Sequence, residues 1–181
     1  MSKSFVLSAI GKDRPGIVAA VTRILYECHC NIEDSSMTIL KGEFAMILIV
    51  SAPESLSLSE LQERFHEVER SMGLFVFLKE LEEIERVPQL SLGSPYMLSV
   101  LGADKPGIVY RVTQAMASCD INITDLNTKT LESGEVPVYV MMLEIEVPPE
   151  VSPEMLDAEL KRLEEELSID ITCNPINSIK L

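Results

Sequence analysis

The stretch that decides the fold is Ser8–Thr22 (SAIGKDRPGIVAAVT), which returns as Ser99–Thr113 (SVLGADKPGIVYRVT). With a shift of 91 residues, Leu7–Leu40 aligns on Leu98–Leu131, and 15 of the 34 positions are identical. Self-similarity at a fixed period is the sequence signature of duplicated structural units. The chain of 181 residues is therefore predicted to contain two copies of one small unit.

The repeat continues beyond Leu40 with a shift of 95 residues, because the second copy carries four extra residues around Glu132–Pro137. We place this insertion at the tip of a hairpin. Further along, apolar residues in both copies step by four, three and four positions, which is the spacing of one face of a helix. These aligned positions are Leu61, Phe65, Val68 and Met72 in the first copy and Leu156, Leu160, Leu163 and Leu167 in the second.

Each copy has the hydrophobic pattern of strand, helix, two strands, helix and strand. The predicted strands are Ser4–Ile10, Ile32–Leu40, Glu43–Ser51 and Leu74–Leu81, with Tyr96–Leu101 and Ile169–Ile176 as the first and last of the second copy. Hairpin turns are expected at Lys41-Gly42 and near Ser133-Gly134. The first helices should bury Ile17, Val18, Val21, Leu25 and Cys28, and Ile108, Val109, Val112, Met116 and Cys119.

This order predicts an α+β chain of two ferredoxin-like βαββαβ units in tandem, each an antiparallel four-stranded sheet with two helices on one face. We expect the first domain at residues 1–81, a linker at 82–94 and the second domain at 95–181. The linker is recognised by its charged residues, Pro and Gly in EEIERVPQLSLGS. Units this small gain stability by packing together, so the copies are expected to associate through sheet edges or helix faces.

Charge and composition exclude several classes of function. The net charge is −14, divided into −5 over residues 1–90 and −9 over residues 91–181. A surface that neutralises phosphates is hard to build from this chain, so direct binding to nucleic acid or to an anionic membrane is disfavoured. The longest apolar run, Phe44–Val50, has the length of a strand, and the four cysteines do not form a secreted disulfide framework. We expect a cytoplasmic protein without a membrane span.

The turn after the first strand carries the candidate binding chemistry. Gly11 and Gly102 are expected to let the chain turn sharply. Arg14 and Lys105 should cap the helix, with proline at its first position. Backbone N–H groups at the helix start favour a carboxylate, and Asp13 could meet an ammonium group. The turn thus suits a zwitterion such as a free amino acid. Asn31 and Asn122 could approach that ligand from across a domain interface.

The same residues are also ordinary capping chemistry at a strand-to-helix turn. The sequence by itself leaves both interpretations open. An alternative function is therefore a protein-interaction module that binds no ligand and uses these turns only for structure.

The G-x-D-[RK]-P-G-I-V segment, followed by Asn-Ile at the next strand, resembles the ACT domain, a regulatory module that binds amino acids. The resemblance covers residues 3–81 and 95–177. Two such domains without a catalytic domain resemble the glycine cleavage system transcriptional repressor family. The resemblance implies ligand contacts at Asp13, Arg14, Pro15, Gly16, Asn31, Ile32, Asp104, Lys105, Pro106, Gly107, Asn122 and Ile123.

The family resemblance also implies a function. It implies an amino-acid-sensing regulator, with glycine as the effector and a transcription activator of glycine-cleavage genes as the protein partner. A homodimer is compatible with it.

Other constellations point to no further chemistry. Cys28-His29-Cys30 aligns with Cys119-Asp120-Ile121, so a metal-binding set is not repeated, and Cys28 and Cys119 fit a helix core face better. His66 follows the core residue Phe65 and should face solvent. No nucleophile lies beside a base in any recognisable motif. We predict neither an enzyme nor a metal or cofactor site.

Overall fold

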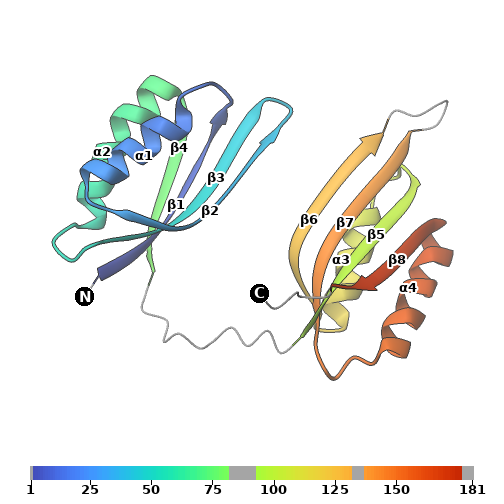
Figure 1. The fold of residues 1–181 in the computed structure, drawn as a ribbon. Helices are drawn as coiled ribbons and strands as arrows, with labels where there is room; N and C mark the ends of the chain where they lie inside the picture. Colours follow the sequence, from blue (N-terminus) through green and yellow to red (C-terminus); the bar gives the residue numbers. More distant parts are fainter. Residues whose placement is uncertain (1, 82–92, 132–136, 177–181) are drawn as a thin grey trace. The chain divides into compact units, whose positions relative to one another are not determined.

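The computed structural model describes residues 2–81, 93–131 and 137–176. The chain divides into two compact units, Met1–Val87 (unit 1) and Pro88–Leu181 (unit 2). Each described unit has the predicted order of strand, helix, two strands, helix and strand (Figure 1). The prediction of two βαββαβ units in tandem is therefore confirmed.

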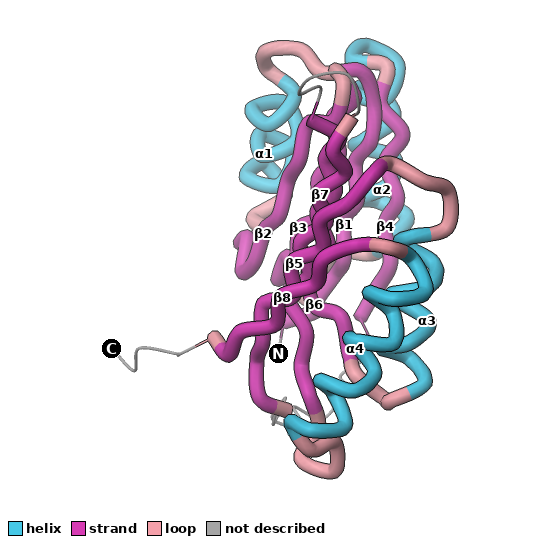
Figure 2. The backbone as a smooth tube through the Cα atoms, turned by 90° about the vertical axis from the view of Figure 1, so that its right-hand side faces the viewer, coloured by secondary structure: helices cyan, strands magenta, loops and turns pink. Residues whose placement is uncertain are grey.

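Unit 1 contains β1 (Ser2–Lys12), α1 (Ile17–Glu27), β2 (Asn31–Leu40), β3 (Glu43–Pro53), α2 (Leu58–Met72) and β4 (Leu74–Leu81). Unit 2 contains β5 (Ser94–Ala103), α3 (Ile108–Ser118), β6 (Asn122–Leu131), β7 (Val138–Val147), α4 (Pro153–Leu167) and β8 (Ile169–Pro175). The strand orders are β2-β3-β1-β4 and β6-β7-β5-β8, and all neighbouring strands are antiparallel. Figure 2 shows α3 and α4 together on one side of the sheet of unit 2.

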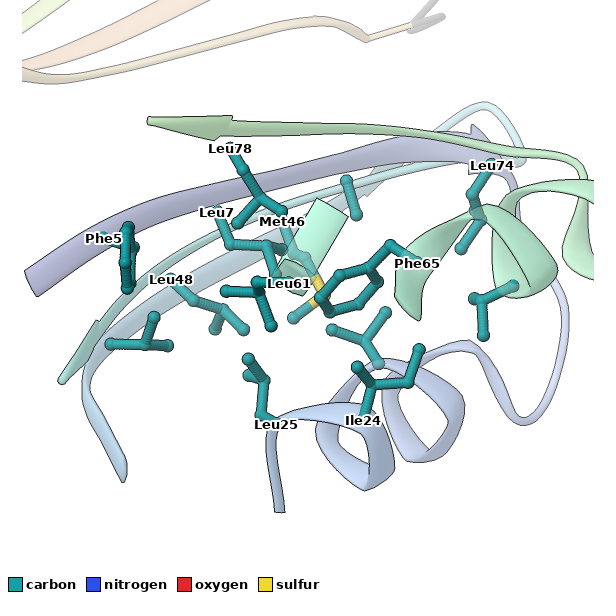
Figure 3. Packing of buried hydrophobic residues seen from close by; sticks show 14 of the residues in the cluster. Phe5, Leu7, Ile24, Leu25, Met46, Leu48, Leu61, Phe65, Leu74 and Leu78 are labelled. Carbon is teal, nitrogen blue, oxygen red and sulfur yellow. The ribbon is translucent and has the colours of Figure 1, made fainter. Parts of the chain in front are cut away.

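The core of each unit lies between the sheet and its two helices. In β3, alternate residues from Phe44 to Ala52 are buried, because successive side chains of a strand point to opposite faces. Helix α2 buries Leu61, Phe65 and Val68. Figure 3 shows Leu61 and Phe65 among the core residues of the sheet. The corresponding residues of α4, namely Leu156, Leu160 and Leu163, are also buried. The predicted faces of the second helices are confirmed at these positions, and their last predicted residues, Met72 and Leu167, are half-buried and pack against the cores.

The predicted face of the first helix is partly wrong. Val18 is 42% exposed and Val109 is 36% exposed, whereas Ile24 and Ala115 are buried. The buried set of α1 is Ile17, Val21, Ile24 and Leu25, and it follows the i, i+4, i+7, i+8 pattern of a helix that covers a sheet. The prediction is thus confirmed for Ile17, Val21 and Leu25 and wrong for Val18, while Ile24 is a buried residue that it omits.

Several strands are longer than their hydrophobic runs. The first strand extends to Ser2 and Lys12 and its counterpart to Ser94 and Ala103, because backbone pairing continues after the apolar alternation stops. The last strand ends at Pro175 instead of Ile176. Ser94, which we had assigned to the linker, begins β5. The remaining linker residues, except Gly93, lie outside the described residues.

Gly11 and Gly102 do not form turns, which corrects the prediction. Both lie inside strands, where the neighbouring strand approaches closely. A Cβ atom on Gly11 would come within 2.8 Å of the carbonyl oxygen of Gly73, and one on Gly102 within 2.6 Å of Cγ2 of Ile169. These positions need glycine for space.

The turn between β2 and β3 is formed by Lys41 and Gly42, both with positive φ angles (50° and 85°), as the sequence predicts. The second predicted hairpin tip, Ser133-Gly134, lies outside the described residues. Within the described part of the chain, no helix is long and apolar enough to cross a membrane.

Candidate functional site

The turn Asp13–Gly16 joins β1 to α1, and its geometry differs from the predicted one. The N-cap of α1 is Gly16 and that of α3 is Gly107, with φ angles of 96° and 98°, so Arg14 and Lys105 are not the caps. Pro15 and Pro106 precede the helices instead of occupying their first positions. The cause is the left-handed conformation, which glycine adopts without steric cost and which redirects the chain after the proline.

The start of α1 presents free backbone donors. Its first intrahelical hydrogen bond runs from the N–H of Ala20 to the carbonyl of Gly16, at 2.9 Å. The N–H groups of Ile17, Val18 and Ala19 therefore have no acceptor within the helix, and no side chain caps them. Together with the helix dipole, these donors favour an anionic group.

A cavity of about 520 Å³ opens at the same turn. Its inner wall includes buried Ile17 and Phe44, and the exposed side chains of Val18 and Met37 form further apolar walls. The rim carries the charged residues Asp13 and Arg14. The full lining is Asp13, Arg14, Pro15, Gly16, Ile17, Val18, Ala19, Thr22, Met37 and Phe44. The structure thus brings together four of the six site residues predicted in the first copy.

Two hydrogen bonds fix the rim of the cavity. The backbone N–H of Asp13 donates to the carbonyl of Gly42 at the hairpin tip, at 2.8 Å. The guanidinium of Arg14 donates through Nη2 to the carbonyl of Ser71, in the last turn of α2, at 2.7 Å. The turn is therefore attached to both the sheet and the second helix, while the carboxylate of Asp13 is exposed to solvent.

The turn of unit 2 has the same backbone but different neighbours. The Thr130 hydroxyl donates to the carboxylate of Asp104 across 3.3 Å. Lys105 is exposed and forms no hydrogen bond or ion pair with the described residues. The positions that align with the cavity walls Ala19, Met37 and Phe44 hold larger or more polar residues, namely Tyr110, Thr128 and Tyr139.

The structure does not bring Asn31 and Ile32 to the turn of their own unit. Asn31 pairs with Ser51, which in turn pairs with Ser4, whereas the turn follows Lys12 at the other end of β1. At about 3.4 Å per residue, these ends lie about 27 Å apart. In unit 2, Asn122 donates through Nδ2 to a carboxylate oxygen of Glu146 at 3.4 Å, and Ile123 packs against the core. Contact of these residues with a ligand from a neighbouring unit stays a prediction.

Sequence reasoning missed Met37 and Phe44 as cavity residues. A signal was present, because a turn at Lys41-Gly42 pairs Ile39 with Phe44 and Met37 with Met46. Residues paired in this way share one face of a sheet. The hairpin register therefore places Met37 and Phe44 on the helix side.

The Cys28-His29-Cys30 segment lies at the other end of unit 1. Burial raises the pKa of the thiols of Cys28 and Cys30, which disfavours the thiolate form that metal binding and nucleophilic attack require. Among the described residues, no three His, Cys, Asp or Glu side chains converge in a way that could hold a metal ion. Cys28 packs against the core, and His66 is exposed, as predicted.

Comparison with known proteins identifies the fold and its relatives. The ACT domain pattern matches residues 3–79 and 95–174. The glycine cleavage system transcriptional repressor of Escherichia coli (strain K12) is 32% identical over 126 residues, which is 69% of this chain and 64% of that protein. The match thus spans less than two thirds of that relative's length.

Two further proteins are similar to this chain. A UPF0237 protein of Methanopyrus kandleri is 39% identical over 75 residues, 41% of this chain and 83% of that protein. The crystal structure of an unknown protein from Galdieria sulphuraria superposes with a TM-score of 0.81 at 30% identity, covering 98% of this chain and all of that one. With both of its units matched, the chain belongs to the ACT domain family and carries two ACT domains in tandem.

Proposed function

We propose that this protein is an amino-acid-sensing regulator and that the cavity at the turn of unit 1 binds the effector. The observation that carries the proposal is the position of that cavity, which contains the free N–H groups at the start of α1 and the exposed carboxylate of Asp13. The N–H groups suit the carboxylate of an amino acid. Asp13 suits its ammonium group, and the walls formed by Met37 and Phe44 suit an aliphatic portion.

The name of the Escherichia coli relative favours glycine as the effector. The cavity of about 520 Å³ is larger than glycine requires, and its walls are largely apolar. The first experiment is therefore a thermal-shift screen against the twenty amino acids, followed by calorimetric titration of each one that stabilises the chain. A ligand at 100 times its Kd is expected to stabilise the native state by about 2.7 kcal/mol. No response to any of the twenty would overturn the proposal.

A matched pair of variants tests which unit binds. Asp13→Asn keeps the shape of the side chain and removes its charge, so it is expected to weaken the binding of the effector about tenfold or more, because the ammonium group loses its counter-charge. Asp104→Asn makes the same change in unit 2, and we expect it to leave the titration unchanged. Equal affinity in the wild type and Asp13→Asn would exclude this role for Asp13.

We further propose that regulation passes through a protein partner. The resemblance to a transcriptional repressor of the glycine cleavage system leads us to propose a transcription activator as that partner. The net charge of −14 opposes direct contact with DNA, where phosphate contacts dominate affinity. An effector acts on such a partner only through its differential affinity for two states of the chain. In a gel-shift assay at physiological salt, the purified chain should not retard DNA from a promoter of glycine-cleavage genes. Retardation by the chain alone would contradict this part of the proposal.

A second candidate function is a protein-interaction module that binds no effector. It is favoured by the structural use of the turn residues, since Arg14 bonds to α2 and Asp104 accepts a hydrogen bond from Thr130. Under this alternative, Asp13→Asn and Asp104→Asn alter stability at most, and no amino acid changes the thermal unfolding of either variant.

A further inference from the structure

The face of the unit 1 sheet that points away from its helices is apolar and exposed. Phe75 is 80% exposed and Phe77 is 63% exposed, both on β4, and Ile10 and Ile47 are about half exposed on β1 and β3. These residues alternate with the buried ones of their strands, so they share the open face. Contiguous exposed apolar surface of this kind marks an interaction site.

The strand register arranges this face in three rows that cross the sheet. Listed from β2 through β3 and β1 to β4, the rows are Thr38–Ala45–Ile10–Phe75, Ser36–Ile47–Ser8–Phe77 and Asp34–Ile49–Val6–Lys79. In the first two rows, β4 carries two phenylalanines and β2 carries the smaller Thr38 and Ser36. Each of the two central strands carries one isoleucine and one small residue. The third row ends in opposite charges, Asp34 on β2 and Lys79 on β4.

The duplicated unit shows that the fold does not require this apolar surface. On the open face of β8, the positions that align with Phe75, Phe77 and Lys79 hold the polar residues Asp170, Thr172 and Asn174. The strand β7 adds the carboxylate of Glu144 to that face, next to the exposed side chain of Met142. Burying the face of unit 2 would therefore desolvate carboxylates, which is costly, whereas burying the face of unit 1 removes mostly apolar surface from water.

We propose that the open face of unit 1 is covered by the same face of a second copy of this chain. Two sheets that pack face to face keep their strands roughly aligned. A two-fold axis parallel to the strands would place β4 of one copy over β2 of the other and β1 over β3, while each row meets itself. We choose a second copy as the partner because rotation about this two-fold axis brings complementary residues of the two identical faces together.

The complementarity concerns both size and charge. Phe75 meets Thr38, and Phe77 meets Ser36, so each large ring faces a small side chain. In the central strands, Ile10 meets Ala45, and Ile47 meets Ser8. The remaining row places Lys79 opposite Asp34 twice, once on each side of the axis. Interdigitation of large with small residues is how packed sheet faces fill space.

This inference goes beyond amino-acid binding and is independent of it. Phe44 and Met37, which line the cavity, lie on the helix side of the sheet, whereas the rows described above lie on the other side. Failure of one proposal leaves the other intact.

The first test is the oligomeric state of the full chain. Sedimentation equilibrium is expected to give twice the 20.1 kDa of one chain. Phe77→Asp places one charge on each side of the two-fold axis, in the middle row of the interface, and should raise the dissociation constant of the dimer about a hundredfold or more. The control is Thr172→Asp, which adds the same charge at the matching position of unit 2 and should leave the dimer intact. Circular dichroism confirms that both variants are folded.

The second test exploits the symmetry of the interface. Asp34→Lys and Lys79→Asp each place like charges opposite one another and should each weaken the dimer about tenfold. The double variant restores opposite charges, so dimerisation should return toward the wild-type level. A wild-type chain that is monomeric would mean that another protein covers the face or that it stays open, and would overturn the proposal. Full dimerisation of Phe77→Asp, or a double variant weaker than both single ones, would overturn it as well.

Discussion

The two ACT domains begin their first helix with the same left-handed glycine and then hold that turn by different contacts. In unit 1 the guanidinium of Arg14 reaches from the turn to the carbonyl of Ser71 in α2. In unit 2 the turn residue is Lys105, and the link between the two helices is an ion pair from Arg111 on α3 to Glu166 on α4. The second helix is therefore bonded to the turn in unit 1 and to the first helix in unit 2.

This difference teaches that the backbone geometry of the turn is the same in both copies, whereas the side chains around it have diverged. At the φ angles of 96° and 98° found here a Cβ atom is strained, and both units have glycine at this position, Gly16 and Gly107. The side chains around the turn have no such constraint. Unit 1 keeps apolar cavity walls and a fixed rim, which is why we assign the effector to it.

The largest expected effect concerns the two glycines inside the first strands. Gly11→Ala should lower the free energy of unfolding by about 2–3 kcal/mol, because the new Cβ meets the backbone carbonyl of Gly73, which cannot rotate away. Gly102→Ala should cost about 1–2 kcal/mol, since its Cβ meets the side chain of Ile169. Urea unfolding followed by circular dichroism measures both. If the two variants lost the same free energy of unfolding, the backbone around Gly73 would have to move aside as easily as the side chain of Ile169, which would contradict this expectation.

A smaller effect is expected at the rim of the turn. Arg14→Ala removes the hydrogen bond to Ser71 and should cost about 1 kcal/mol, a value suited to a charged donor at an exposed position. Lys105→Ala removes a side chain without a partner among the described residues and should stay within about 0.5 kcal/mol of the wild type. Thermal unfolding of the two variants compares them directly. A larger loss for Lys105→Ala would reverse the proposed difference between the turns.

The smallest effect concerns the caps of the second helices. Ser57 forms a complete capping box with Glu60, whereas Ser152 accepts one bond from the N–H of Met155 at 3.3 Å. We expect Ser57→Ala to cost about 1 kcal/mol and Ser152→Ala about 0.5 kcal/mol near neutral pH. Urea unfolding measured as a function of pH gives both values.

The pH dependence should separate the two caps. Hydrogen bonds from the backbone N–H and hydroxyl of Ser57 lower the pKa of Glu60. A lowered carboxyl pKa contributes stability above its unfolded value, and this contribution is lost as the pH falls through the folded value. The cost of Ser57→Ala should therefore shrink in acid. The pKa of Glu154 is lowered mainly by its own backbone N–H, so the cost of Ser152→Ala should change less. A cost of Ser57→Ala that is constant down to acid pH would contradict this account.

Much of the fold could be predicted because local patterns determine it. The repeat, the alternation in β3 and the helical steps of α2 and α4 identify each element, and Lys41-Gly42 identifies the turn between β2 and β3. Helix starts were less predictable, since proline favours a first helical position in general and here stands before a left-handed glycine. The exposure of Val18 could not be predicted either, because an apolar residue in the sequence can line an open cavity as well as a buried core.

The candidate site was predictable only in part. The turn from Asp13 to Gly16 is contiguous in sequence, so its residues could be recognised together. The walls Met37 and Phe44 come from the hairpin between β2 and β3. Its local register indicates that both residues lie on the helix side of the sheet, but it does not indicate that the hairpin reaches the Asp13–Gly16 turn. Asn31 is predicted to approach the ligand from across a domain interface. Within its own unit, the strand register places it at the end away from the turn.

The hydrogen bond from the N–H of Asp13 to the carbonyl of Gly42 makes one amide proton a reporter for the whole mouth of the cavity. This proton is protected from exchange with solvent only while the turn and the hairpin tip stay together. Its exchange rate therefore reports how often the turn and the hairpin tip separate. An effector that bridges them would slow that single rate, which would allow occupancy to be followed at one atom without labelling the ligand.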